Sequence, residues 1–308
     1  MARHILRPVL GQVADVFSPD AAPVCMVAPG DEIHVETLDA WGFLEPQTVP
    51  GEMRPVMFPA RRGHCLAGPI AVEGARPGDL LAVRLVDLRP ASWGWTSAGA
   101  HDTELNRRLA IDQTRWLLWE LDPLARVGTC SAGYTVDLAP FLGVIGLAPA
   151  EPGQHSTIPP RACGGNLDCR ELVAGSTLFL PVEVDGALLY VGDGHAAQGD
   201  GEVSGTAVEC AMATDLVVGI AEDPALHVLH ASTPAGRITF GVDPDLDVAM
   251  TQALDAMVGW MAHVLTCSRA EAMALASVAV DLRVTQVVNR TFGVHALWPD
   301  GRLRATRD

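Results

Sequence analysis

The sequence predicts a mainly β protein of the β-sandwich or barrel-like kind, with a minor helical part made of two helices near the C-terminus. Three observations lead to this prediction. Short strand-like segments bounded by turn residues fill the first two thirds of the 308 residues. No alternation of strands with helices, which parallel α/β folds require, accompanies them. Helical spacing of apolar residues is concentrated close to the C-terminal end.

Two of the predicted strands follow a Pro-Gly-Asp turn. Residues 29–31 precede a strand at 32–37, and residues 77–79 precede a strand at 80–86. Both strands alternate in polarity or are rich in β-branched residues, as half-buried strands do. Further strands are expected, in chain order, at 216–221, 226–229 and 237–240.

A β-hairpin is predicted in the middle of the chain. Strand-like residues 176–184 and 187–191 are separated by Asp185-Gly186. This dipeptide tolerates the positive φ angles of a tight two-residue turn, so the two strands are expected to pair.

Two helices and a returning strand are predicted at the C-terminal end. The first helix covers 246–265 behind the start signal Asp243-Pro244-Asp245. Its apolar residues recur every three or four positions and are expected in the core: Met250, Leu254, Met257, Met261 and Val264. Ser268 and Glu271 match a capping box, which predicts a second helix up to about residue 280. A strand at 281–289 then returns the chain to the sheet.

No linker separates independent modules, so residues 1–308 are expected to form a single unit. Approximate subdomains are a β-rich part at 1–160 and a second β-rich part with the C-terminal helices at 161–308. The region 89–125 is interpreted either as ordinary packing or as an insertion that covers a pocket. Four tryptophans cluster in it: Trp93, Trp95, Trp116 and Trp119.

Composition excludes several classes of function. Hydrophobic residues make up 49% and charged residues 19%, as in a compact globular protein. The 21 basic and 37 acidic residues give a net charge of −16, which disfavours nucleic acid and anionic membranes as partners. The chain contains no lysine. P-loop nucleotide binding, pyridoxal-phosphate chemistry and lysine-based catalysis are therefore excluded.

The compartment is expected to be the cytoplasm. The first residues lack the apolar stretch and small-residue cleavage site of a secretory signal. No uninterrupted apolar run reaches the roughly 18–20 residues of a membrane helix. The seven cysteines include no C-x-x-C pair, which favours reduced thiols over a disulfide framework or a cysteine-rich zinc site.

The segment 191–205 is the strongest candidate for a functional site. Five glycines alternate there with polar residues, namely Asp193, His195, Gln198, Asp200 and Glu202. Glycines permit a tightly held backbone, and carboxylates with one imidazole suit Zn²⁺ or Ca²⁺. A solvated turn is an equally weighted alternative. The pattern is not a dinucleotide-binding loop, because it lacks G-x-G-x-x-G and a following helix.

A second polar motif, residues 164–171, precedes the predicted hairpin. Asn166 and Asp168 are two residues apart, so on an extended segment both would face one pocket. An Asx turn that leads into a strand is the alternative. Arg170 and Glu171 are interpreted as a local ion pair or as solvated side chains without a role.

These motifs resemble those of the acetamidase/formamidase family. The resemblance rests on five stretches in the family's order, at 68–79, 145–149, 164–168, 192–202 and 276–286 with 293–296. It implies a β-dominated acetamidase/formamidase fold with C-terminal helices, metal-dependent hydrolysis of short aliphatic amides, and a homo-oligomer. Leu167 stands where the family usually has Met, and His64-Cys65 where smaller members have Asn-Pro. Together with the poorly matching region 89–125, this leaves the size of the substrate open.

Chemical requirements agree with a metal enzyme, because the absence of lysine excludes the serine and cysteine amidases that depend on one. The hypothesis places Zn²⁺ on Asp168, Asp193 and His195, and gives Glu202 the proton transfer from water to nitrogen. Asn166 and Gln198 would hydrogen-bond the amide or the oxyanion. Several further residues have two interpretations each. Asp200 and Glu209 either bind a second cation such as Ca²⁺ or cap turns, and Asp39 is either a turn residue or a strand end that reaches the site. His64 belongs either to the pocket or to the core, and His295 is expected to be structural rather than catalytic. Cys163 and Cys169 are disfavoured as nucleophiles because no suitably spaced base accompanies them.

Two alternatives to hydrolysis of formamide-like or acetamide-like substrates remain. One is hydrolysis of a larger amide, with His64 and the tryptophan-rich region reshaping the pocket. The other is a non-catalytic β protein in which the Gly-Asp segment binds Ca²⁺ structurally and the cleft only binds a small molecule.

Overall fold

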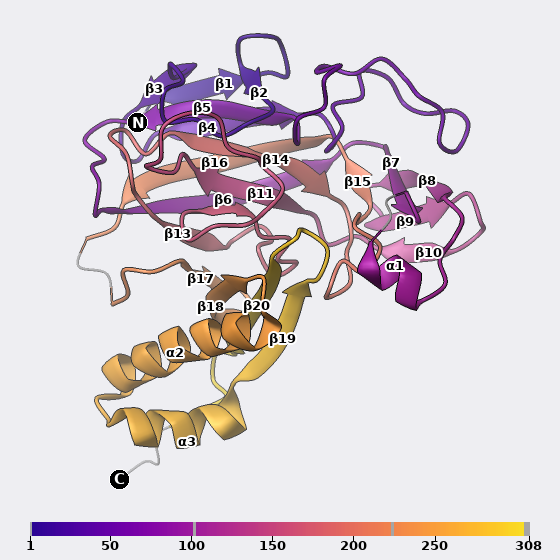
Figure 1. Cartoon of the computed structure of the whole chain (residues 1–308). Coiled ribbons are helices and arrows are strands. Elements are labelled where there is room, and N and C mark those ends of the chain that lie inside the picture. Colours follow the sequence, from indigo (N-terminus) through magenta and orange to yellow (C-terminus); the bar gives the residue numbers. More distant parts are fainter. Residues whose placement is uncertain (1, 101–102, 223–224, 305–308) are drawn as a thin grey trace.

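Two large β-sheets form most of the computed structural model, which describes residues 2–100, 103–222 and 225–304 (Figure 1). In the described residues the first sheet has nine strands, in the order β1 (Arg3–Leu6), β4 (Glu32–Thr37), β16 (Met212–Ile220), β6 (Leu80–Pro90), β13 (Thr177–Pro181), β17 (His230–Thr233), β18 (Gly236–Asp243), β20 (Phe292–Trp298) and β19 (Asp281–Gln286). The predicted mainly β class is therefore confirmed.

The second sheet carries the candidate site. Its main path is β10 (Thr135–Asp137), β9 (Val127–Cys130), β8 (Arg115–Asp122), β7 (Trp93–Ala98), β15 (Glu209–Cys210), β14 (Leu189–His195), β11 (Phe141–Leu147) and β12 (Gly164–Asn166). Off this path, β5 (Leu66–Val72) pairs with β14 and with β2 (Val13–Ala14) and β3 (Cys25–Val27).

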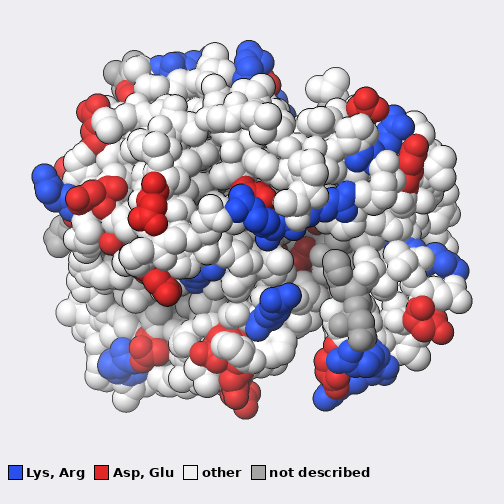
Figure 2. All heavy atoms as spheres, turned by 45° about the horizontal axis from the view of Figure 1, so that its top comes forward, with Lys and Arg blue, Asp and Glu red and all other residues white. Residues whose placement is uncertain are grey.

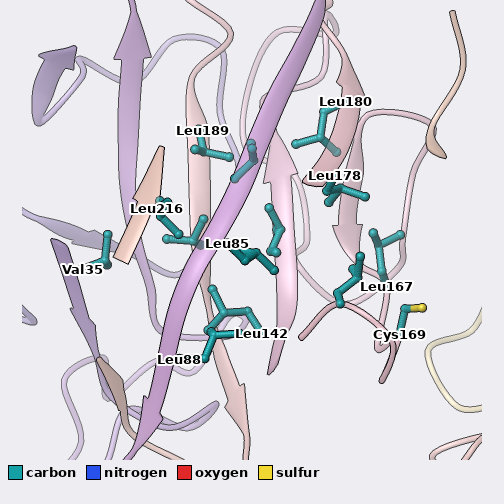
Figure 3. Close-up of a cluster of buried hydrophobic side chains, with 14 of the residues drawn as sticks. Val35, Leu85, Leu88, Leu142, Leu167, Cys169, Leu178, Leu180, Leu189 and Leu216 are labelled. Carbon is teal, nitrogen blue, oxygen red and sulfur yellow. The ribbon is translucent and has the colours of Figure 1, made fainter. Parts of the chain in front are cut away.

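The two sheets share a hydrophobic core. Strands of the first sheet alternate between buried and partly exposed residues, as in β16, so one face packs inward. In the second sheet every residue of β11 and β14 is buried. Figure 3 shows side chains of both sheets in this core, including Leu85 and Leu216 from the first and Leu142 and Leu189 from the second. Burial on both faces fixes the strands that end at the candidate site.

The C-terminal helices lie where the sequence predicts them. Helix α2 (Leu246–Leu265) is capped by Asp245, and α3 (Arg269–Ala279) begins with the complete capping box of Ser268 and Glu271. Both pack below the sheets, with α2 against β18 and β20 (Figure 1). The remaining described helix is the short α1 (Glu104–Arg108). None of the helices in the described ranges is long and apolar enough to cross a bilayer.

The predicted inner face of α2 is partly wrong. Met257 and Met261 are buried as expected, but Met250 and Val264 are 38% and 43% exposed. The buried face includes Ala249 and Ala253 instead. The reason is a close approach to β18: a Cβ on its Gly241 would lie only 1.8 Å from the backbone oxygen of Ala249. Small residues must therefore face the sheet there.

The predicted hairpin is also wrong, although both of its strands exist. β13 pairs with β6 and β17 in the first sheet, whereas β14 pairs with β5, β11 and β15 in the second. Three consecutive residues, Gly186, Ala187 and Leu188, have positive φ angles. The turn bonds to residues 72 and 75 and carries the chain from one sheet to the other.

Other strands agree with the prediction except at one segment. The strands expected at 32–37, 80–86, 216–221, 237–240 and 281–289 correspond to β4, β6, β16, β18 and β19. Residues 226–229 are not a strand, because β17 begins only at His230.

The tryptophan-rich region 89–125 extends the second sheet through β7 and β8; its residues 101 and 102 lie outside the described part. Trp95 is fully buried and its ring contacts those of Trp41 and Trp116, at centroid distances of 5.2 and 4.8 Å. Trp95 also pairs with Glu209 between β7 and β15. The region is thus part of the framework that holds the candidate site.

Figure 2 shows acidic and basic side chains interspersed over one face of the molecule, with several arginines beside a recess near its middle. Every basic side chain drawn there is arginine, because the chain has no lysine.

Candidate metal centre

Four carboxylates and one histidine meet where strands of the second sheet end. Asp193 and His195 lie at the end of β14, Asp168 follows β12, Glu209 begins β15, and Glu202 lies in the loop between β14 and β15. All five residues are buried, and the largest exposed fraction among them is the 7% of Glu202. Isolated buried charges are strongly unfavourable, so this cluster needs a partner of opposite charge.

The spacing of the donor atoms suits a small cation. The Nε2 atom of His195 lies 3.4 Å from Oδ1 of Asp193 and 3.3 Å from Oε2 of Glu209. Bond lengths of about 2.0–2.2 Å put the ligands of a tetrahedral zinc about 3.3–3.6 Å apart. Ligand atoms of Asp168, Asp193 and His195 all lie within 4.8 Å of one another, as do those of His195, Glu202 and Glu209.

Within the part of the chain that the structure describes, four buried atoms at this place have no hydrogen-bond partner. They are Oδ1 of Asp168, Oδ1 of Asp193, Nε2 of His195 and Oε2 of Glu209. An unpaired buried polar atom costs about 1–3 kcal/mol and more when it is charged, so four together are not expected by chance. Their chemistry, one imidazole nitrogen and three carboxylate oxygens, fits a divalent cation such as Zn²⁺.

Gly143 on β11 forms the floor of this cluster. A Cβ at this position would lie 2.5 Å from Oδ2 of Asp193, 2.7 Å from Oδ1 of Asp168 and 2.8 Å from Cε1 of His195. These distances are too short for any side chain, so only glycine leaves room for the converging ligands.

The backbone is strained at three of the four acidic residues of the cluster. Asp168, Asp193 and Glu202 have φ angles of 51°, 61° and 43°, in the left-handed region that residues with a Cβ rarely adopt. Strain of this kind persists only where surrounding contacts enforce it, and it is concentrated at functional sites. Here it turns three carboxylates toward one point.

Neighbouring side chains fix the orientation of the ligands. Nδ1 of His195 lies 2.9 Å from Oε1 of Gln198, whose Nε2 donates to the backbone oxygen of Asp168 at 2.7 Å. Because Gln198 Oε1 can only accept, His195 carries its proton on Nδ1 and presents the lone pair of Nε2 to the centre. The side chain of Asn289 donates to Oδ2 of Asp168 at 2.6 Å, which leaves Oδ1 for a cation.

Burial and mutual repulsion shift the acid–base properties of the cluster. Burial raises the pKa of both Asp168 and Glu209 to about 7, and burial together with the charge of Asp168 raises the pKa of Glu202 well above its usual range. Burial opposes ionisation of Asp193 as well, but His64 and His195 outweigh it and lower the pKa of Asp193. All four carboxylates therefore lie close to a single histidine, His195, and three of them have their pKa raised by burial and by a neighbouring carboxylate.

The predicted substrate-binding residues occupy different places. Asn166 donates from Nδ2 to the backbone oxygen of Ile158 at 3.0 Å, while its buried Oδ1 has no partner. His64 points Nε2 toward Oδ2 of Asp193 at 3.9 Å and bonds Thr157 through Nδ1 at 2.8 Å. Both polar groups of Gln198 are engaged within the protein, so its visible role is to orient His195.

Two acidic residues behave differently from the interpretation of the sequence. Asp200 does not join Glu209; it pairs with Nε of Arg283 at 2.8 Å. Glu171 is neither solvated nor paired with Arg170. It is buried and bonds to Arg283, which is 112 positions away in the chain. Both corrections have one cause, since strand β19 brings an arginine to the loops around the site.

Three contributors were not expected in their present roles. Glu209 faces His195 directly, Asn289 bonds Asp168, and Gly143 leaves space for the ligands. A signal existed only for Glu209, a carboxylate close to the Gly-Asp segment. Asp39 accepts hydrogen bonds from the backbone of Phe43 and from Nε1 of Trp95, as a turn residue would.

Comparison with known proteins identifies the family of the chain. The sequence pattern described as "Acetamidase/Formamidase family" matches residues 10–153 and 150–235. The chain belongs to the acetamidase/formamidase family. It is 29% identical over 269 residues to a formamidase of Methylophilus methylotrophus, covering 69% of this chain and 65% of that protein. It is 28% identical to an acetamidase of Mycolicibacterium smegmatis, covering 61% and 60%. The chain thus spans less than two thirds of the length of these relatives.

Solved structures of the family share the whole fold. An acetamidase of Bacillus halodurans superimposes with a TM-score of 0.84 at 29% identity, covering 96% of both chains. An acetamidase of Yersinia enterocolitica gives a TM-score of 0.82 at 25% identity, covering 96% of this chain and 92% of that one. A gamma lactamase of Delftia acidovorans, at 23% identity and a TM-score of 0.65, has the same fold.

Proposed function

We propose that the protein is a metal-dependent hydrolase of short aliphatic amides, which releases ammonia and a carboxylate. The observation that carries the proposal is the set of four unpartnered donor atoms on Asp168, Asp193, His195 and Glu209. Family membership and relatives named formamidase and acetamidase support the amide as substrate.

Zn²⁺ is the cation that we propose for this centre. Ca²⁺ prefers six to eight oxygen ligands, whereas an imidazole nitrogen 3.3–3.4 Å from two carboxylate oxygens favours a smaller, borderline ion. Asp168, Asp193 and His195 would hold it as three ligands, with Glu209 beside His195, so that one coordination position stays open for water or the amide oxygen. When bound, such an ion polarises the amide carbonyl and makes water more acidic.

Glu202 is proposed as the group that moves the proton. It lies beside His195 and Glu209, and burial raises its pKa well above the usual range, which favours the form that holds a proton. In the reaction water oxygen bonds to the carbonyl carbon while Glu202 takes the water proton. Glu202 then delivers this proton to the amide nitrogen as the C–N bond breaks, so that ammonia leaves.

Asn166 and His64 are proposed to hold the substrate. The free Oδ1 of Asn166 can accept a hydrogen bond from the amide NH₂ group. His64 is fixed through Thr157 and points its Nε2 toward Asp193 of the centre.

The cellular compartment and the assembly state are also part of the proposal. Seven free cysteines, five of them buried, support a reducing compartment such as the cytoplasm. Assembly into a homo-oligomer is proposed from the family resemblance alone.

The test is ammonia release from formamide, acetamide and longer linear amides, with metal content measured on the same sample. Activity should disappear on chelation and return with Zn²⁺. A Glu202→Gln variant should keep its metal and fold but lose turnover by about 10²–10⁴-fold. Glu73→Gln, which changes an exposed carboxylate, should match the wild type. Unchanged turnover in Glu202→Gln removes Glu202 from the mechanism, and a metal-loaded enzyme inactive on every amide refutes the proposed function.

A further inference from the structure

A second cluster of potential ligands begins at the residue that follows Asp168 and has no residue in common with the first. Cys169 and Glu171 follow Asp168 in the chain, and His295 lies on β20. One ligand atom of each lies within 4.8 Å of the others, and all three residues are buried. Figure 3 shows the sulfur of Cys169 at the edge of the leucine core, pointing away from Leu167 toward the C-terminal, yellow part of the chain.

The distances in this cluster match those of a small metal site. Sγ of Cys169 lies 3.4 Å from Oε2 of Glu171, and Nε2 of His295 lies 3.4 Å from the same oxygen. A tetrahedral zinc with sulfur at about 2.3 Å and nitrogen or oxygen at about 2.0–2.2 Å has donor separations of about 3.3–3.6 Å between nitrogen and oxygen and about 3.5–3.7 Å between sulfur and either of them. The three donors are thus preorganised around one point.

His295 supplies the independent sign of a ligand. Its side chain is 0% exposed, and its Nε2 has no hydrogen-bond partner among the described residues although it faces Glu171. Nδ1 bonds to Oγ1 of Thr285 at 2.8 Å. An imidazole bonded through one nitrogen, with the other free and directed at a thiol and a carboxylate, has the arrangement of a metal-binding histidine.

Charges around the cluster also suit a divalent cation. Arg283 bonds to Oε1 of Glu171 and to Asp200, whereas Oε2 of Glu171 accepts a hydrogen bond from the thiol of Cys169, so that a cation would take the place of the thiol proton between these two atoms. With Cys169 bound as a thiolate, the negative charges of Cys169, Glu171 and Asp200 and the positive charge of Arg283 sum to −2. A divalent cation balances this charge, and the mixture of sulfur, nitrogen and oxygen donors selects Zn²⁺ over Ca²⁺ or Mg²⁺.

We propose that Cys169, Glu171 and His295 form a second, structural Zn²⁺ site. The ion would join three segments that surround the first centre. These are the stretch that continues from Asp168, the β19–β20 pair, and the loop at Asp200, which Arg283 ties to Glu171. Gly201 of this loop, next to Glu202, bridges to Gln286 at the end of β19. The second ion would therefore stabilise the backbone that positions Asp168 and Glu202.

The test uses the full chain reconstituted with Zn²⁺ or Co²⁺ and freed of excess metal. Wild type should bind two equivalents of Zn²⁺, and the Co²⁺ form should show thiolate-to-cobalt charge-transfer absorption. Cys169→Ser should bind one equivalent and lose this absorption. The control Cys267→Ser, which changes a cysteine outside the cluster, should bind two equivalents and keep the absorption. Asp193→Asn should lose the first ion and retain the thiolate absorption, which separates this proposal from the proposed function.

Diffraction at the zinc absorption edge should place a peak between Cys169, Glu171 and His295. Wild type that takes up a single equivalent without thiolate absorption overturns the proposal. The same holds if the absorption persists in Cys169→Ser. Because the spectrum and the diffraction peak are measured on wild type, the proposal remains testable even if Cys169→Ser fails to fold.

Discussion

Replacing Gly143 by alanine tests the proposed metal centre without removing any ligand. The new methyl group would lie 2.5 Å from Oδ2 of Asp193 and 2.7 Å from Oδ1 of Asp168. Ordinary van der Waals contact begins near 3.4 Å. Gly143 has no positive φ angle, so the substitution acts through the lost space and not through backbone strain.

The size of the effect follows from these distances. Restoring contact at 3.4 Å requires movements of 0.9 Å at Asp193 (3.4 − 2.5) and 0.7 Å at Asp168 (3.4 − 2.7). Overpacking of this kind costs about 1–3 kcal/mol of stability. Misplacement of catalytic groups by about 1 Å costs roughly 10²-fold in rate. We therefore expect kcat to fall about 10–100-fold and the bound metal to be lost at much lower chelator concentration.

The assay is a chelator titration followed by metal content, ammonia release and thermal unfolding of the same samples. The matched control is Gly219→Ala on β16, where a Cβ would meet nothing within 4 Å. This control should keep metal and activity and should be as stable as wild type or slightly more so. If Gly143→Ala binds metal and turns over like the control, the ligands do not converge over Gly143 and the centre is placed wrongly.

Three further predictions follow from single contacts. Gln198→Ala removes the acceptor for His195 Nδ1 and should weaken metal affinity about 10–100-fold by calorimetry; unchanged affinity contradicts an orienting role. Burial raises the pKa of Asp39 to about 6, so the folded state holds this proton more tightly than the unfolded chain. The free energy of unfolding of wild type relative to Asp39→Asn should then fall by on the order of 2–3 kcal/mol between about pH 4 and pH 6 in urea titrations; a difference independent of pH disproves it. Ser268→Ala breaks the capping box of α3 and should lower stability by about 1 kcal/mol with unchanged kcat, since the helix lies below the sheets; altered kcat would point to coupling with the site.

Local signals were sufficient for much of the fold. Helix α2 begins at Leu246 because Asp245 caps it, and both residues are adjacent in the chain. The capping box of α3 is equally local. Such elements are predictable because the atoms that decide them lie within one turn. The buried face of α2 was not predictable, since it depends on how closely Gly241 of another strand approaches Ala249.

The hairpin shows where turn chemistry stops being informative. Asp185-Gly186 does form a turn, but the strands on either side belong to different sheets. The dipeptide permits a tight turn whatever follows it. The partner of the turn, residues 72 and 75, lies more than a hundred positions away. Pairing is decided by these long-range bonds, which no local pattern contains.

The candidate site likewise contains residues that local sequence identifies and residues that only strand pairing brings to it. Asp193, His195 and Glu202 could be found because they are polar residues within ten positions of one glycine-rich stretch, residues 192–202. Glu209 acquires its place only through the pairing of β14 with β15, which sets it opposite His195. Gly143 acquires its place because β11 pairs with β14 on the other side. A ligand set of this kind is a property of the sheet, and sequence spacing alone underestimates its size.

The residues after β12 show how one short segment can serve two purposes. Asp168 has a positive φ angle and turns its carboxylate to the first centre, whereas the next residue, Cys169, directs its sulfur to Glu171 and His295. A residue in this conformation reverses the direction of the chain, so neighbours need not alternate as they do in a strand. Asn166, Asp168 and Cys169 therefore cannot be assigned to faces by counting residues. Loss of the second cation should consequently disturb Asp168, which makes the first centre sensitive to a thiol that takes no part in its chemistry.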